Sequence, residues 1–314
     1  MLRIVSLLPS ATEILFAIGA GDEIVGVTHE CDFPQQALLL PKLTAAAGPH
    51  CESALDIDRH VRAAVHAGSS LYRLDAELLE RLAPDLIVTQ ELCPVCAVSY
   101  EIVDAAAKRS CSDARIVSLE PKTLRDVLST ITLLGDITGH ADRAVRVVAA
   151  LEARVEQVAA FARAGMTERV RTLVLEWTDP PMSAGHWIPE VVELAGGLAI
   201  LANPGANSQR LQWSQIAAAD PDAIVVAPCG FDLIKTDRAI ADLDRIKAWR
   251  GLSARRRGRV LALDGNAYLS RPGPRLVEAT EILAQWYTSG AEHAGRSPSN
   301  AGEESPGFTG LGAG

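Results

Sequence analysis

The chain has 314 residues, of which 48% are hydrophobic and 22% charged, a composition typical of soluble globular proteins. This composition excludes disordered, collagen-like and membrane-spanning classes, and 314 residues correspond to two ordinary domains or one large one. The 30 Lys and Arg against 39 Asp and Glu give a formal net charge of -9, which argues against a nucleic-acid partner.

The first twenty residues are apolar enough to suggest a secretory signal, but polar residues interrupt the run at Pro9, Ser10, Thr12 and Glu13. We interpret them as a strand, Ile4–Leu8, followed by a helix that Ser10 and Glu13 open as a capping box. No other apolar run approaches the roughly 20 residues of a membrane span. The sequence therefore predicts a cytoplasmic protein without a signal peptide, whose six cysteines are free thiols.

Short β-branched runs alternate with helical patterns in two blocks, which predicts an α/β protein with parallel sheets. After Ile4–Leu8, the predicted strands are Ile24–Thr28, Asp85–Gln90, Arg115–Leu119, Arg171–Trp177, Ala223–Pro228 and Arg259–Leu263. The predicted helices around them are Leu74–Leu82, Pro189–Leu194, Gln212–Ala219 and Pro274–Tyr287.

Two helical segments, Leu124–Ile137 and Ala141–Ala164, separate the blocks. The second is rich in helix-forming residues over about 36 Å, which is long for a globular protein. It is either a surface helix of one large domain or a rigid bridge between two α/β lobes. The predicted division is an N-terminal lobe at 1–122, a helical linker at 123–166 and a C-terminal lobe at 167–289. The tail at 290–314, rich in Gly, Ser, Pro, Ala and Glu, is predicted to be disordered.

Ligands of open α/β sheets bind beyond the carboxyl ends of the strands, and chemically reactive residues gather in the segments that follow the predicted strands. Four of the six cysteines and two of the seven histidines fall there. The candidate metal ligands are Cys31, Cys93, Cys96 and Cys229, with His29 and His186 nearby in the same set of loops. Taken singly, each of these residues has a structural interpretation; together they predict a ligand site on one rim.

No GxSxG elbow, Walker A motif or HExxH motif is present, and no nucleophile stands at a recognisable spacing from a base. The sequence therefore indicates a binding protein and not an enzyme.

Several segments are similar to the substrate-binding proteins of cobalamin and iron-siderophore ABC importers. They are the opening Ile4–Glu13, Val25–Thr28, Asp32–Pro34, Leu82–Ile87 and the closing Ser270–Arg275. The resemblance covers residues 2–288 and is strongest to the cobalamin-binding members. It implies two Rossmann-like lobes joined by one long bridging helix, a ligand cleft between them and, as partner, an ABC permease.

The resemblance also implies which residues touch a corrinoid: His29, Glu30 and Cys31 in the first lobe, and Asn266, Tyr268, Ser270 and Arg271 in the second. We add Gln90 and His186 from the strand ends, and the aromatic residues Trp177, Trp187 and Phe231, which with Tyr268 would cover the flat macrocycle. His29 or His186 would approach the metal, and Arg271 or Arg275 would meet amide or phosphate groups.

The leading hypothesis is thus a binding protein for a corrinoid such as cobalamin, or for a related metal chelate. A second hypothesis is direct binding of a metal ion or cluster by the cysteines, with redox or enzymatic activity, because four Cys and two His exceed what a corrinoid needs. A third is an interaction protein that retains the scaffold without its ligand.

Overall fold

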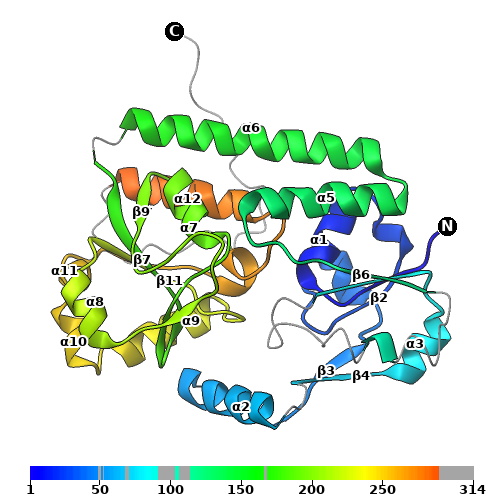
Figure 1. The fold of residues 1–314 in the computed structure, drawn as a ribbon, viewed down its shortest axis with the longest axis horizontal. Coiled ribbons are helices and arrows are strands. Elements are labelled where there is room, and N and C mark those ends of the chain that lie inside the picture. Colours follow the sequence, from blue (N-terminus) through cyan, green and yellow to red (C-terminus); the bar gives the residue numbers. More distant parts are fainter. Residues whose placement is uncertain are drawn as a thin grey trace.

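A computed structural model of the protein describes residues 1–48, 51, 53–67, 71–90, 103–105, 114–165 and 168–289. Two α/β lobes lie side by side, and long helices run along one edge of both (Figure 1). This arrangement confirms the predicted fold class of two lobes joined by one long helix.

The first lobe is built on a four-stranded sheet that is parallel throughout, in the order β2-β1-β5-β6. Its strands are β1 (Ile4–Ser6), β2 (Ile24–Val27), β5 (Leu86–Thr89) and β6 (Arg115–Ser118), and its helices include α1 (Pro9–Ala17), α3 (Ala76–Leu82) and the 3₁₀ turns η1 (Gly21–Glu23) and η2 (Gln35–Leu39). A separate antiparallel pair, β3 (Thr44–Ala46) and β4 (Tyr72–Leu74), flanks helix α2 (Ala54–His66) in the chain.

Successive residues of these strands enter opposite cores, as the pleat requires. Ile4 and Leu86 pack with α1 on one face, whereas Val5 and Ile87 pack with Leu79 of α3 on the other. Because helices cover both faces, the strands are buried on both sides and are almost entirely apolar.

The second lobe holds a six-stranded mixed sheet. Strands β9, β7, β11 and β12 run parallel, while β8 is antiparallel to β7 and β10 is antiparallel to β8. The strands are β7 (Val170–Thr178), β8 (Pro181–Ser183), β9 (Gly197–Ala199), β10 (Gln209–Arg210), β11 (Ala223–Val226) and β12 (Val260–Ala262). The helices are α7 (Ile188–Leu194), α8 (Trp213–Ala219), α9 (Leu233–Leu243), α10 (Lys247–Gly251), α11 (Ser253–Arg256), η3 (Gly265–Leu269) and α12 (Leu276–Ser289). The sequence predicted the parallel strands β7, β11 and β12, but neither the parallel strand β9 nor the antiparallel strands β8 and β10.

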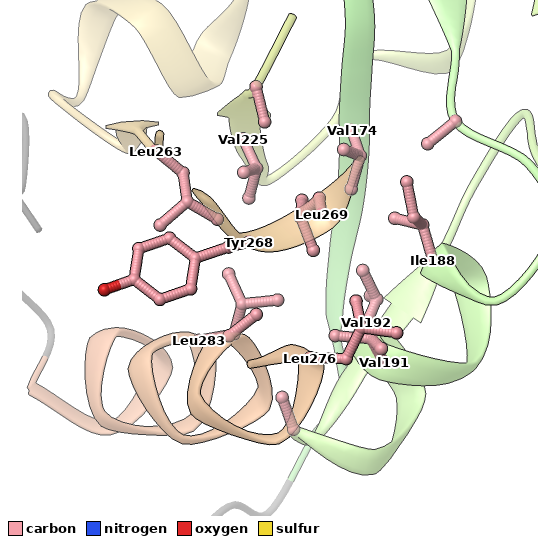
Figure 2. Packing of buried hydrophobic residues seen from close by; sticks show 14 of the residues in the cluster. Val174, Ile188, Val191, Val192, Val225, Leu263, Tyr268, Leu269, Leu276 and Leu283 are labelled. Atoms are coloured by element: carbon pink, nitrogen blue, oxygen red, sulfur yellow. The ribbon is translucent and has the colours of Figure 1, made fainter. Parts of the chain in front are cut away.

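One face of this second sheet packs against α7 and α12 (Figure 2). Val174 and Val225 point from β7 and β11 toward Leu269, and Leu276 and Leu283 close the cluster from α12. The other face packs on α8, α10 and α11 around the fully buried Trp249.

The helices at the shared edge are α5 (Leu124–Thr138) and α6 (Ala141–Gly165) (Figure 1). Helix α5 begins at a capping box of Thr123 and Asp126, and it ends at Gly139, whose φ of 77° suits glycine. Helix α6 is one continuous helix whose Leu151 lies in the core of the first lobe and Val158 in the core of the second. The interpretation of this segment as a bridge is therefore confirmed.

Core residues are also exchanged between the lobes. Val277 of α12 packs in the first lobe's cluster, and Leu124 and Val127 of α5 pack in the second lobe's cluster. The predicted boundaries at 122, 166 and 289 stay a proposal, and the tail at 290–314 lies outside the described residues.

The predicted capping box at Ser10 and Glu13 is wrong. Helix α1 follows Leu8, whose side chain makes no cap hydrogen bond, and begins with Pro9, which is suited to the first turn because its missing N–H is not needed there. Glu13 is instead buried and forms ion pairs with Arg271 and Arg275 of the second lobe.

Candidate ligand-binding site

The carboxyl ends of the strands in the two lobes face one another. Asn266, which follows β12, donates a hydrogen bond of 3.0 Å to Asp32, which follows β2. Gly265 permits a close approach here, because a Cβ at this position would overlap the carbonyl oxygen of Pro228 after β11. Two of the strand ends that the sequence singled out, those of β2 and β12, thus meet across the lobe boundary.

A buried ion-pair network ties the lobes together beside these strand ends. The Arg271 guanidinium donates to Asp32, to the carbonyl oxygen of Glu30 at 2.9 Å and to Glu13 at 3.3 Å. Arg275 donates to the Glu13 carboxylate at 3.0 and 2.6 Å. The side chains of Arg271 and Glu13 are only 5% and 2% exposed.

Arg271 and Arg275, which were predicted to meet amide or phosphate groups of the ligand, are thus engaged in ion pairs between the lobes. Burial by itself lowers the pKa of the Arg271 guanidinium, but the hydrogen bonds and charges of Asp32 and Glu13 outweigh it and raise that pKa. Arg271 and Asn266 also bond to each other at 3.0 Å. The Nη donors of Arg271 are therefore used by Asp32, Glu13 and Glu30 of the first lobe and by Asn266 of the second.

His29 and Glu30 stand at the rim of the first lobe. His29 Nδ1 lies 2.7 Å from Thr44 Oγ1, and His29 Nε2 lies 3.3 Å from Glu30 Oε1. The hydrogen bond from His29 lowers the pKa of Glu30, against the effect of burial. Tyr72 packs beside the imidazole, with ring centroids 5.7 Å apart. The ring is thus held in one orientation and remains partly exposed.

Cys31 belongs to the core of the first lobe. It is 1% exposed, its Sγ lies 3.1 Å from Thr12 Oγ1, and burial raises the pKa of its thiol to about 11. A metal ligand must be a thiolate, so this environment does not fit the predicted metal-binding role.

Within the described part of the chain, no group of three or more His, Cys, Asp and Glu side chains could hold a metal ion. Cys229 is half-buried after β11. Cys93 and Cys96 lie outside the described residues.

The predicted aromatic residues divide into two groups. Trp177 and Phe231 form an edge-to-face pair, with centroids 5.3 Å apart, at the ends of β7 and β11. Trp187 is buried and donates through Nε1 to the carbonyl oxygen of Leu269 at 2.9 Å. Tyr268 lies between Leu263 and Leu283 in the core (Figure 2). The first pair is at the strand ends, whereas Trp187 and Tyr268, which were predicted to cover a ligand, lie in the core of the second lobe.

Three other predicted residues are largely enclosed. Gln90 is buried at the end of β5. His186 adopts a positive φ of 51°, and neither its Nε2 nor the Ser270 hydroxyl has a hydrogen-bond partner among the described residues.

Glu176 of β7 accepts a hydrogen bond of 2.7 Å from Ser208 and one of 3.4 Å from the backbone N–H of Gly185, the residue before His186. Burial raises the pKa of the Glu176 carboxyl.

A cavity of about 420 Å³ lies between the lobes, where α2 of the first lobe faces α9 of the second. Helix α2 projects under the second lobe (Figure 1), and its Asp58 forms an ion pair of 2.8 Å with Arg210 of β10. The apolar lining includes Leu55, Ile57 and Phe231. The volume falls within the range of small-molecule sites, so the cavity is suited to a partly apolar ligand.

Sequence reasoning missed most of this cavity because it placed no helix at α2 or α9. Signals for both helices were present. Asp232 caps α9 by accepting from the Lys235 N–H at 2.8 Å, and Ser53 accepts from the Asp56 N–H at 3.1 Å where α2 begins.

Two α/β lobes, a helix shared between them and a cavity at their boundary define a two-lobed ligand-binding protein. The chain belongs to the periplasmic binding protein family, whose model matches residues 4–267. The resemblance to importer substrate-binding proteins is thereby confirmed, and the chain is a binding protein and not an enzyme.

Two relatives are each 25% identical over 292 residues. One is the vitamin B12-binding protein of Vibrio cholerae serotype O1, and the match covers 90% of this chain and 88% of the relative. The other is an uncharacterised ABC transporter substrate-binding lipoprotein of Bacillus subtilis, with 90% and 79% covered. The crystal structure of a periplasmic heme-binding protein from Pseudomonas aeruginosa has the same fold, with a TM-score of 0.71, 21% identity and coverage of 92% and 93%.

These findings overturn the predicted cytoplasmic location, because the family is periplasmic and the Bacillus relative is a lipoprotein. The argument from the N-terminal residues was wrong because Ile4–Ala17 form β1 and α1 of the fold and carry no information on the compartment. Among the helices that the structure describes, none is long and apolar enough to cross a membrane.

Proposed function

We propose that the protein binds a corrinoid of the cobalamin type between its lobes and delivers it to an ABC permease. The observation that carries this proposal is the cavity of about 420 Å³ bounded by α2 and α9, with Phe231 in its wall and Trp177 against Phe231. Aromatic rings at such a boundary suit the face of a flat macrocycle. The Vibrio relative, a vitamin B12-binding protein, supports the choice of ligand.

Within this proposal, His29 is the residue that approaches the metal of the ligand. Its Nδ1 is held by Thr44 at 2.7 Å, which fixes the ring in the way that outer partners orient metal-binding histidines. His29 is not among the residues that line the cavity, so a corrinoid, which is larger than about 420 Å³, would extend from the cavity to the rim of the first lobe, where Nε2 would exchange its contact with Glu30 for the ligand. Cobalt here is part of the cargo, and the chain itself supplies one nitrogen.

The test is a titration with hydroxocobalamin, followed by visible absorbance and by calorimetry. We expect binding at micromolar concentrations, and a shift of the visible bands that is lost in His29→Gln. His140→Gln is the matched control, because His140 pairs with Glu23 at 3.1 Å, at the start of α6 and away from the cavity.

Hemin is the comparison ligand, since the Pseudomonas structure is that of a heme-binding protein. Hemin binding without corrinoid binding would reject the corrinoid in favour of a porphyrin. No binding of either ligand would reject the proposal.

A further inference from the structure

The cavity between the lobes has a cationic edge on α9. Lys235 and Arg238 line it one helical turn apart, a spacing that places their side chains next to each other. Arg245 also lines the cavity but forms an ion pair of 3.2 Å with Asp242. Lys235 and Arg238 have no ion-pair partner among the described residues, so both are available to a ligand.

Helix α9 fixes the backbone from which these two exposed side chains project. Its first turn is capped by Asp232, and Thr236 and Ala239 on its inner face are buried. The Thr236 hydroxyl donates to the carbonyl oxygen of Leu263 at 3.3 Å, which ties the helix to the end of β12. The two residues are thus anchored at the backbone, and their exposed side chains reach the cavity from there.

The rest of the lining defines the shape of a matching ligand. Apolar side chains come from both lobes, including Leu55 and Ile57 of α2 and Leu243 of α9. The lining carries three cations and two carboxylates, Asp179 and Asp242, so its formal charge is positive in a chain of net charge -9. This combination suits a largely apolar molecule with a negatively charged group at one edge.

We propose that Lys235 and Arg238 bind an oxyanion, a carboxylate or a phosphate, on the edge of the ligand. This inference rests on the proposed binding function. Lys235 and Arg238 then have the role that the sequence suggested for Arg271 and Arg275. The guanidinium groups of Arg271 and Arg275 instead form ion pairs with Glu13 and Asp32. Arginine binds such groups through paired N–H donors, and lysine adds a point charge.

The experiment uses pairs of probes that differ in the oxyanion. Hemin carries two carboxylates and its dimethyl ester carries none; cobalamin carries a phosphate that cobinamide lacks. Dissociation constants are measured by absorbance for the wild type, for Lys235→Gln/Arg238→Gln and for Lys247→Gln/Arg250→Gln. The last is a matched control, because Lys247 and Arg250 are exposed at the same spacing on α10, outside the cavity lining.

We expect the wild type to bind one oxyanion-bearing probe at least about tenfold more tightly than its neutral counterpart, which is the equivalent of one hydrogen bond to a charged group. Lys235→Gln/Arg238→Gln should lose that preference while keeping its affinity for the neutral probe, and the control should keep both. Preference within the hemin pair identifies a carboxylate. Because cobinamide also lacks the ribose and dimethylbenzimidazole of cobalamin, preference within the corrinoid pair identifies a phosphate only where Lys235→Gln/Arg238→Gln abolishes it.

Two results overturn the inference in distinguishable ways. If the wild type binds a corrinoid but neither pair is discriminated, or if Lys235→Gln/Arg238→Gln keeps the discrimination, the cationic edge has no such role and the proposed function stands. If the wild type binds none of the four probes, the proposed function falls as well.

Discussion

Replacing Glu13 by Gln tests the buried ion-pair network that joins the lobes. The Glu13 carboxylate is 2% exposed and accepts three hydrogen bonds, one from Arg271 and two from Arg275. A glutamine offers one acceptor oxygen and turns an NH₂ group toward a guanidinium. Arg271 keeps Asp32, but Arg275, which is 14% exposed, loses its ion pair.

The expected cost follows from these contacts. Two lost hydrogen bonds to charged groups, at about 1.5–3 kcal/mol each, agree with the roughly 3–5 kcal/mol typical of breaking a buried ion pair from one side. We therefore expect Glu13→Gln to lower the free energy of unfolding by about 3–5 kcal/mol, measured by urea denaturation. Because the contacts couple, Glu13→Gln combined with Arg275→Gln should cost less than the sum of the two single changes.

Glu281→Gln is the matched control. Glu281 accepts two hydrogen bonds of 2.8 Å from Arg154, but Arg154 is 37% exposed, so solvent screening limits the loss to about 1 kcal/mol or less. If Glu13→Gln costs no more than Glu281→Gln, the reasoning that burial makes the Glu13 network important is refuted.

Three further predictions concern other parts of the molecule. Arg210→Ala removes the ion pair that joins β10 to Asp58 of α2, so hydroxocobalamin should dissociate faster in stopped-flow measurements. The free energy of unfolding should change by less than about 1 kcal/mol, because Arg210 is 41% exposed. An unchanged dissociation rate would contradict a role of this ion pair in holding the ligand. Burial raises the pKa of the Cys31 thiol from 9.0 to about 11, so the contribution of this thiol to the free energy of unfolding is intact below pH 9 and is lost as the pH rises through 11. Cys31→Ala should remove this part of the pH dependence. At pH 8, iodoacetamide should modify the half-buried Cys229 well before Cys31, as peptide mass spectrometry will show. Deletion of 290–314 should leave the melting temperature unchanged, since the composition of that segment predicts no packed structure.

Local patterns predicted most of the parallel strands and the bridging helix. β1 and β5 are short apolar runs buried on both faces, and α6 has helix-forming residues without proline over its 25 residues. Each of these signals is contained in adjacent residues, which is why sequence alone sufficed.

The details of the site depend on contacts that no local pattern encodes. Glu13 and Arg271 are 258 residues apart in the chain, so nothing near Glu13 marks it as an ion-pair partner, whereas its spacing from Ser10 imitates a capping box. Trp187 and Tyr268 follow the predicted pattern of loop aromatics, but burial in the second lobe assigns them to its core. The cavity also needs α2 and α9 from different lobes, and only the tertiary fold brings them face to face.

The exchange of core residues between the lobes has a consequence for how the protein loses its structure. Unfolding the first lobe would uncover Val277 of α12, and unfolding the second would uncover Leu124 and Val127 of α5. Helix α6 would lose part of its apolar packing in either event, since Leu151 and Val158 belong to different cores. We therefore expect that neither half folds on its own, and heating should produce a single calorimetric transition with equal calorimetric and van't Hoff enthalpies.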